Sequence, residues 1–208
     1  MAESAVEGHD GRVTRGFDRA AVVAVVIGGL MMTALFVPFT LAHGPTSFNE
    51  ERLVLGFDMH RWGLLLGVLP NLLIGAGLWR LRKRITAGRR EPSTALVILC
   101  CALMLDGLLN LGLGSLGAPF VLFILAPTIL ALAAVAPAGG LGRVRLRVLL
   151  AALGVSLAVG VALALLAQAT SDAFGGYRVF GILVYGVGGL LWASLGASLA
   201  SLDVRQDS

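Results

Sequence analysis

Asp106 is the residue of this sequence with the clearest potential for chemistry, because it is the only charged residue in a long apolar segment. That segment runs for 51 residues from Pro92 to Gly142. Placing a charged aspartate at the centre of a membrane helix costs about 2.5 to 3.5 kcal/mol, so such a residue usually faces a bundle interior or a wet cavity. A carboxyl group in that position could bind a cationic solute or carry a proton.

Two asparagines are expected near this carboxyl group. Asn110 follows Asp106 by one helical turn and projects from the same face. Counting helical rise from Trp62 places Asn71 about 13 Å below the outer membrane boundary, and a matching count places Asp106 about 10 Å below it. Pro70 precedes Asn71 and removes one helical hydrogen bond, so we expect a kink there.

Three further polar side chains, those of Thr128, Tyr185 and Gln168, fall in the same outer half of the membrane. The sequence supports two interpretations of this polar layer. In one, spans two, three and four wall a cavity that opens to the outside and binds a solute. In the other, the polar groups form hydrogen bonds that hold helices together, each worth about 0.6 to 2 kcal/mol. The candidate solute-binding residues are Asp106, Asn110, Asn71, Thr128 and Tyr185.

The residue types of a metal centre are present but are not spaced for one. His43, Asp58 and His60 form a conceivable metal site in an outer loop, but no tight ligand spacing supports it. Cys100 and Cys101 are adjacent in an apolar run, which fits neither a disulfide framework nor a zinc site. All three histidines fall outside the expected spans, and this disfavours haem ligation by two histidines. We therefore expect no metal and no cofactor.

Signatures of known intramembrane enzymes are also missing from the sequence. The Asp106-Gly107 pair could begin a CDP-alcohol phosphotransferase motif, but the further aspartates of that motif are absent. The chain has no Gly-x-Ser-Gly of the rhomboid type and no phosphate-binding Walker sequence. An intramembrane enzyme is therefore only the third choice of function.

The overall composition identifies an integral membrane protein. Of the 208 residues, 57% are hydrophobic and 13% are charged, against about 25% charged residues in a soluble globular domain. The mean hydropathy is +0.89. This balance excludes a soluble enzyme, a disordered tail and a nucleic-acid-binding module, so the partner expected first is the lipid bilayer.

Six apolar stretches separated by charges or turn residues predict six membrane helices, each of about 20 residues. The third and fourth are divided by the glycine-rich segment Gly112 to Pro119, since one helix over that whole region would be about 76 Å long. The fold class is therefore all-α, a six-helix bundle over residues 20–202 with tails at 1–19 and 203–208. The expected spans are residues 20–42, 62–79, 93–113, 120–138, 148–168 and 179–202.

The distribution of cations predicts the orientation of this bundle. With both termini on one side, 13 of the 16 Lys and Arg residues fall on that side and three on the other. The positive-inside rule then places both termini in the cytoplasm and favours an even number of spans. The first apolar run is too long for a secretory signal, so we expect an uncleaved first span in the cytoplasmic membrane of a bacterium.

The outer loop from His43 to Arg61 contains a helix-start pattern. Ser47 and Glu50 fit a capping box, and apolar residues then recur near helical spacing. We expect a short amphipathic helix that lies on the outer surface and leads into span two.

Small residues recur at four-residue spacing in several spans, which lets helix backbones approach closely. We expect most of them to pack this chain on itself, although the stripe on span one could dock another subunit. The basic segment Arg80 to Arg90 is explained by the positive-inside rule without a nucleic-acid partner. The stripes are Ala20, Ala24 and Gly28; Gly63 and Gly67; Ser156, Gly160 and Ala164; and Gly189, Ala193 and Ala197.

Together these features favour a protein that binds or transports a small solute through the outer-half cavity. In size and span count alone, the chain resembles the substrate-binding membrane components of vitamin uptake systems, an analogy at the level of fold. The alternative is a non-catalytic accessory subunit that docks a larger membrane complex through its small-residue stripes.

Overall fold

A computed structural model describes residues 4–44, 47–48, 53–113, 118–137, 139–169 and 178–201. Nearly all of these residues are helical, so the predicted all-α fold class is confirmed. The elements in chain order are α1 (Ser4–Ala42), β1 (His43–Gly44), β2 (Ser47–Phe48), α2 (Met59–Gly63), the π-helical η1 (Leu64–Val68), α3 (Leu69–Arg80), α4 (Arg82–Thr86), α5 (Arg90–Leu113), α6 (Ala118–Val135), α7 (Gly140–Ala169), the π-helical η3 (Ile182–Val187) and α9 (Gly188–Ser201).

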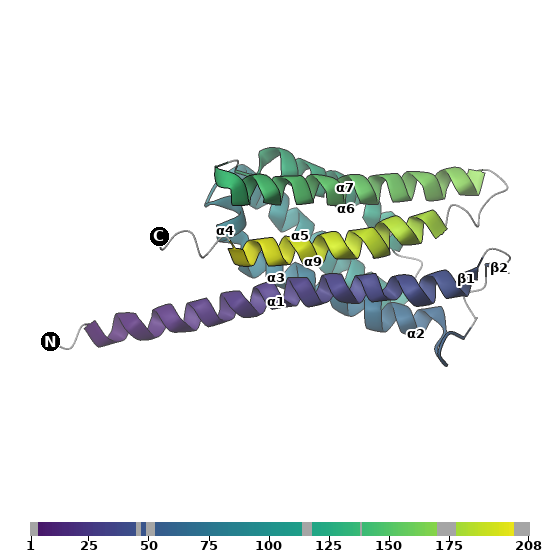
Figure 1. Cartoon of the computed structure of the whole chain (residues 1–208), viewed down its shortest axis with the longest axis horizontal. Helices are drawn as coiled ribbons and strands as arrows, with labels where there is room; N and C mark the ends of the chain where they lie inside the picture. Colours follow the sequence, from purple (N-terminus) through teal and green to yellow (C-terminus); the bar gives the residue numbers. More distant parts are fainter. Residues whose placement is uncertain are drawn as a thin grey trace.

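The long helices form a closed ring in chain order. Helix α1 packs against α3, α3 against α5, α5 against α6, α6 against α7, and α7 against α9, which returns to α1 (Figure 1). The first turns of α1 extend past the ends of the other helices (Figure 1). Because every long helix has two neighbours, side chains on the inward faces of all of them meet at the centre of the ring.

Five helices in the described part of the chain are long and apolar enough to cross a membrane. They cover Asp18–Leu41, His60–Arg80, Arg90–Leu109, Gly140–Leu166 and Arg178–Ser201. Helix α6 occupies the place of the fourth predicted span, and its described apolar part, Leu122–Val135, is shorter than the others.

Two of the helices begin well before the apolar spans predicted for them. Helix α1 starts at Ser4, although its apolar run starts at Ala20, and α7 starts at Gly140 instead of near Val148. The charges that mark the edge of the apolar run do not stop a helix, because arginine is itself a good helix former. The positions of the charges therefore predict where the apolar run ends and not where the helix ends.

The expected amphipathic surface helix is wrong for the residues that the structure describes. Ser47 lies in β2 and pairs with Gly44, while Glu50 lies outside the described residues. Val54 and Phe57 bridge around a tight turn in which Leu55 and Gly56 both have positive φ.

That turn explains why helical structure starts late in this loop. Positive φ at both central positions suits a type I′ turn and cannot continue a helix. Helical structure begins only at Met59, where the Asp58 side chain accepts a hydrogen bond of 2.8 Å from the Arg61 N–H.

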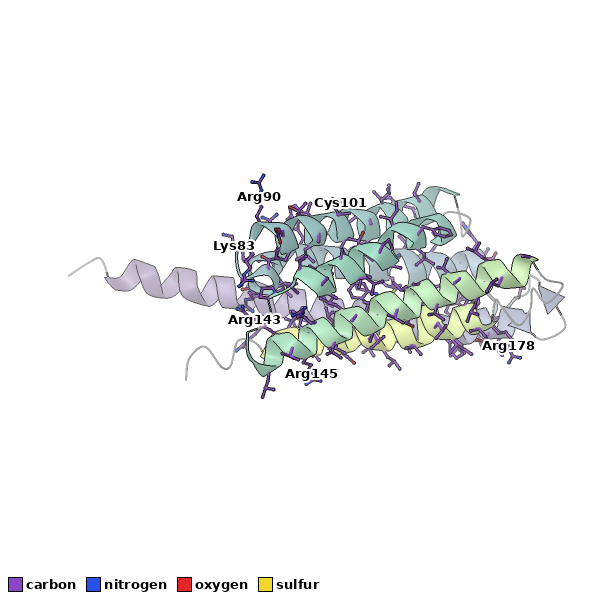
Figure 2. The ribbon with its side chains drawn as sticks, turned by 90° about the horizontal axis from the view of Figure 1, so that it is seen from above. Lys83, Arg90, Cys101, Arg143, Arg145 and Arg178 are labelled. Carbon is purple, nitrogen blue, oxygen red and sulfur yellow. The ribbon has the colours of Figure 1, made fainter. Side chains whose placement is uncertain are left out.

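The basic segments collect at one end of the bundle. Lys83, Arg90, Arg143 and Arg145 lie at this end, and Arg178 lies at the other (Figure 2). Asp18 of α1 joins the basic end through ion pairs with Arg80, at 3.2 Å, and Arg84, at 2.8 Å. We call this region the basic end of the bundle.

Arg147 has a further structural role at the basic end. Its guanidinium donates to the carbonyl oxygens of Ala133 and Ala134, at 3.0 and 3.2 Å. These carbonyls belong to the last turn of α6, where a cation satisfies free acceptors and offsets the helix dipole. Arg147, in the first turns of α7, therefore caps the C-terminal end of α6.

Candidate functional site

Asn71 of α3 and Asp106 of α5 meet in the interior of the bundle. The Asn71 Nδ2 atom donates a hydrogen bond of 2.6 Å to Asp106 Oδ2. Only 3% of Asn71 and 6% of Asp106 is exposed. The expectation that the two side chains lie at the same depth is thus confirmed, and α3 and α5 are joined by a buried polar pair.

This pair lines a cavity at the centre of the helix ring, which we call the central cavity. The space within it that the centre of a water molecule can reach is about 40 Å³. Spans two, three and four form part of its wall, as the sequence predicts, but α1, α7, η3 and α9 contribute as well. The lining residues are Met32, Gly67, Asn71, Leu103, Asp106, Leu122, Leu125, Leu157, Val184, Tyr185 and Trp192.

A change of helical register places Asn71 in this lining. The π-helical turn η1 ends at Val68, directly before Leu69 and Pro70. Pro70 has no N–H to donate, and in a regular α-helix its ring would clash with the carbonyl of Leu66. The wider π-helical turn before Pro70 relieves that clash. Pro70, from which a kink was expected, is therefore accommodated by η1. Turns of this kind inside α-helices often occur at functional sites.

A second π-helical turn, η3, carries Tyr185, which also lines the central cavity. Within η3, the Leu183 carbonyl accepts from the backbone N–H of Gly188 and also from Ser156 Oγ of α7, at 2.8 Å. The Ser156 hydroxyl thereby ties η3 to α7. From the sequence alone, Ser156 is only one member of a small-residue stripe, and this hydrogen bond could not be predicted.

The ring of Tyr185 is fixed by an aromatic cluster. Its ring centre lies 5.2 Å from that of Phe39 and 5.8 Å from that of Phe180, the latter in an edge-to-face arrangement. Such geometries are favourable for aromatic pairs. Tyr185 is therefore held against the central cavity by packing from α1 and from its own helix.

One acceptor of the polar pair is left without a donor. Asn71 Oδ1 is buried and has no hydrogen-bond partner among the residues that the structure describes. A buried polar atom left unsatisfied costs about 1 to 3 kcal/mol. Because Asn71 lines the central cavity, the missing donor has room to be a bound species.

The other predicted site residues are not all brought into the cavity. Thr128 is absent from the lining, and its hydroxyl donates within α6 to the Ile124 carbonyl, at 2.6 Å. The backbone of Asn110 continues α5, but its side chain, like that of Gln168, lies outside the described residues. Of the five candidates, the structure therefore gathers Asn71, Asp106 and Tyr185.

Sequence reasoning missed two large side chains of the lining, Met32 and Trp192. Trp192 is 2% exposed, although a tryptophan in a membrane helix is more often found at the interface. Its position in the middle of the sixth predicted span was a signal that could have identified it.

The described residues contain no group of three or more His, Cys, Asp or Glu side chains that could hold a metal ion. Asp58, one member of the conceivable metal site, caps α2. The side chain of His43 lies outside the described residues. Cys100 is buried and Cys101 is exposed, so the adjacent cysteines occupy different faces of α5.

Comparison with known proteins adds no relative: no family model, no curated protein and no solved structure matches this chain.

Proposed function

We propose that this chain is a multi-pass protein of the cytoplasmic membrane that binds and transports a small solute through the central cavity. The observation that carries the proposal is the buried hydrogen bond between Asn71 and Asp106 in the wall of a cavity. In the proposed topology six helices cross the membrane, and the basic end and both termini face the cytoplasm.

The unsatisfied amide oxygen of Asn71 favours a binding site over a purely structural hydrogen bond. A pair that serves only to hold helices together gains most when all of its donors and acceptors are matched. Here the amide donates through Nδ2, Oδ1 finds no donor among the described residues, and Asn71 is a lining residue of the cavity. The arrangement lowers the net value of the pair for packing and supports a role in binding.

The small-residue stripes give little support to the alternative of an accessory subunit. Gly28 of the span-one stripe lies against α3, where an added Cβ would be 2.7 Å from an Ile74 side-chain carbon. Gly160 faces η3, and Gly189 faces α1. The glycines that permit close approach are thus used between helices of this chain.

The proposal is tested by thermal unfolding of the purified protein with a panel of probes: sodium, ammonium, choline, glycine and glycerol. A solute present at 100 times its Kd stabilises the folded state by about 2.7 kcal/mol. For a chain of this size, that raises Tm by about 5 to 11 °C. We expect at least one probe to do so in the wild type and to have no effect on Asp106→Asn.

The matched control is Thr128→Val, which removes a polar group from the same half of the bundle but outside the cavity lining. It should keep the full shift. If no probe shifts the wild type, or if the shift persists in Asp106→Asn, the proposed site is wrong.

The proposed topology has its own test in reporter fusions at the C-terminus. A reporter that works only in the cytoplasm should be active there. Activity of a reporter that works only outside the cytoplasm would overturn the orientation.

A further inference from the structure

Resting on the function proposed above, we propose that the solute of the central cavity is a small monovalent cation of the size of Na⁺. It is held by the Asp106 carboxylate, by Asn71 Oδ1 and by one or two water molecules. Four properties of the site carry this inference: its volume, its charge, its unused acceptor and its apolar walls.

The volume of the cavity excludes most organic solutes. A water molecule needs about 10 to 15 Å³ of this kind of volume, so 40 Å³ holds about three or four such positions. A drug-sized ligand is far larger than a few water molecules. A vitamin-sized solute does not fit this space, whereas one ion with one or two waters does.

The charge of the cavity selects a single positive charge. Asp106 is the only acidic residue among the described lining residues, and no Lys or Arg is among them. Four labelled basic residues, Lys83, Arg90, Arg143 and Arg145, lie at the basic end of the bundle instead, and Arg178 lies at the other end (Figure 2). A monovalent cation would neutralise the carboxylate, but a divalent cation would leave one uncompensated charge in an apolar interior, which is costly.

The hydrogen-bond pattern supplies an oxygen that faces no donor. Because Asn71 Nδ2 is used by Asp106 Oδ2, the amide is oriented with Nδ2 toward the carboxylate, and Oδ1 is left without a donor among the described residues. Amide and carboxylate oxygens are ligands that hard cations prefer. Tyr185 is a third polar residue of the same lining.

The walls around these oxygens are apolar and strengthen the attraction. Met32, Leu103 and Trp192 come from three different helices and are largely buried. A low effective dielectric constant increases the interaction between a cation and the carboxylate relative to water. The site therefore has few ligands but a strong electrostatic attraction for a cation. This combination suits an ion that must bind and also dissociate.

The experiment measures binding of radioactive ²²Na⁺ to the intact purified protein at constant ionic strength, with choline chloride as the balancing salt. We expect about one Na⁺ per chain in the wild type. Asp106→Asn should weaken binding about 100-fold or more, and Asn71→Val about 10-fold, since hydrogen bonds and contacts to charged groups are the strong ones. Thr128→Val should bind as the wild type does.

Folding of each variant is checked by its elution as a single species and by its helical circular dichroism. Asp106→Asn preserves the shape of the side chain, and Asn71→Val supplies a second, uncharged change on the partner helix. A folded Asp106→Asn that binds Na⁺ with wild-type affinity would overturn the inference.

The outcomes separate the failure of this inference from failure of the proposed function. If choline, glycine or glycerol raises the Tm of the wild type in an Asp106-dependent way while ²²Na⁺ does not bind, the cation is wrong and the solute site stands. If neither Na⁺ nor any probe of the panel acts through Asp106, both proposals fall.

Discussion

At the contact between α1 and α9, no side chain fits at the glycine positions. Beside the central cavity, in contrast, a glycine has open space around it. At the contact, a Cβ added to Gly189 would lie 2.7 Å from the carbonyl oxygen of Gly29 and 2.6 Å from the backbone nitrogen of Thr33. Both of those neighbours are backbone atoms, which cannot move aside cheaply. The two helices therefore touch along their backbones, as small residues permit in membranes.

At the cavity, the same residue type leaves space. A Cβ added to Gly67 would meet nothing nearer than a Leu35 side-chain carbon at 3.9 Å, an ordinary contact distance. A bundle that can close to backbone contact at one helix pair is not loosely packed in general. The comparison indicates that the space around Asn71 and Asp106 is a local property of the site, set by η1, η3 and the polar pair.

The largest effect is expected from a substitution at the close contact between α1 and α9. Gly189→Ala places a methyl group against the backbone of α1, and overpacking of this kind costs about 1 to 3 kcal/mol. The Tm should fall by about 2 to 12 °C in a chain of this size. Thermal unfolding followed by size-exclusion chromatography measures the shift.

The control for that variant is Gly63→Ala, because a Cβ at Gly63 meets no atom within 4 Å. It should unfold at or slightly above the wild-type temperature, since alanine favours helices. Equal melting of the two variants would show that the contact between α1 and α9 is less close than described.

The next largest effect is expected from breaking the polar pair of Asn71 and Asp106, which tests whether this pair stabilises the bundle. Asp106→Leu should destabilise it by about 1 to 3 kcal/mol, because the buried Asn71 amide loses its acceptor. Adding Asn71→Leu should restore the stability to the wild-type level or above, as replacing buried polar pairs with apolar residues often does. Unfolding of the two single variants and the double variant gives the coupling energy.

A double variant that remains as unstable as the sum of the two single variants would contradict this expectation. In that case the coupling energy would be zero, and the two side chains would contribute to stability independently of each other. If the double variant instead recovers stability and loses Na⁺ binding, the polar pair serves binding, whereas the contact between α1 and α9 serves stability.

The hydrogen bond between Asn71 and Asp106 also depends on which helix faces meet, but their similar depth could be predicted from the sequence because it depends only on helical rise and membrane thickness. These are constants that hold in any spanning helix. The walls of the cavity could not be predicted in the same way. Met32 and Trp192 reach it because α9 returns to α1, and ring closure depends on which helix faces approach each other.

Local register was the second feature that sequence reasoning could not supply. Pro70 predicts a disturbance of its helix, but whether the helix kinks or widens into η1 is decided by packing against neighbouring helices. Nothing in the residues of η3 marks its wider turn. In the outer loop, the capping pattern at Ser47 competed with the pairing of β1 and β2, and a four-residue pattern is too short to determine that outcome.

A smaller effect is expected at Ser156, which ties α7 to η3. Ser156→Ala removes the hydrogen bond to the Leu183 carbonyl, and interhelical bonds of this kind contribute about 0.6 to 2 kcal/mol. Because Leu183 belongs to the turn that carries Tyr185, Na⁺ binding should weaken as well. The two readouts are the Tm and the apparent Kd for ²²Na⁺.

Ser198→Ala is the matched control, because its hydroxyl bonds within its own helix to the Ser194 carbonyl. It should leave Na⁺ binding unchanged. If Ser156→Ala also leaves binding unchanged, the position of η3 does not influence the cation site.

The smallest effect is expected at Asp18, whose partly exposed carboxylate lies at the basic end of the bundle. Its carboxylate pairs with Arg80 and Arg84 at the start of the first candidate span, and ion pairs near the surface contribute about 0.2 to 1 kcal/mol. Asp18→Asn should therefore lower the Tm by at most about 4 °C at low salt, and the difference should shrink at about 1 M KCl because of screening. Potassium is used so that ionic strength changes without supplying the proposed ligand, and Na⁺ binding should stay at the wild-type level. Loss of Na⁺ binding in Asp18→Asn would mean that the field of the basic end extends to the central cavity. The two carboxylates would then act as one electrostatic system, and Asp106 could not be treated as the sole source of the charge that holds the cation.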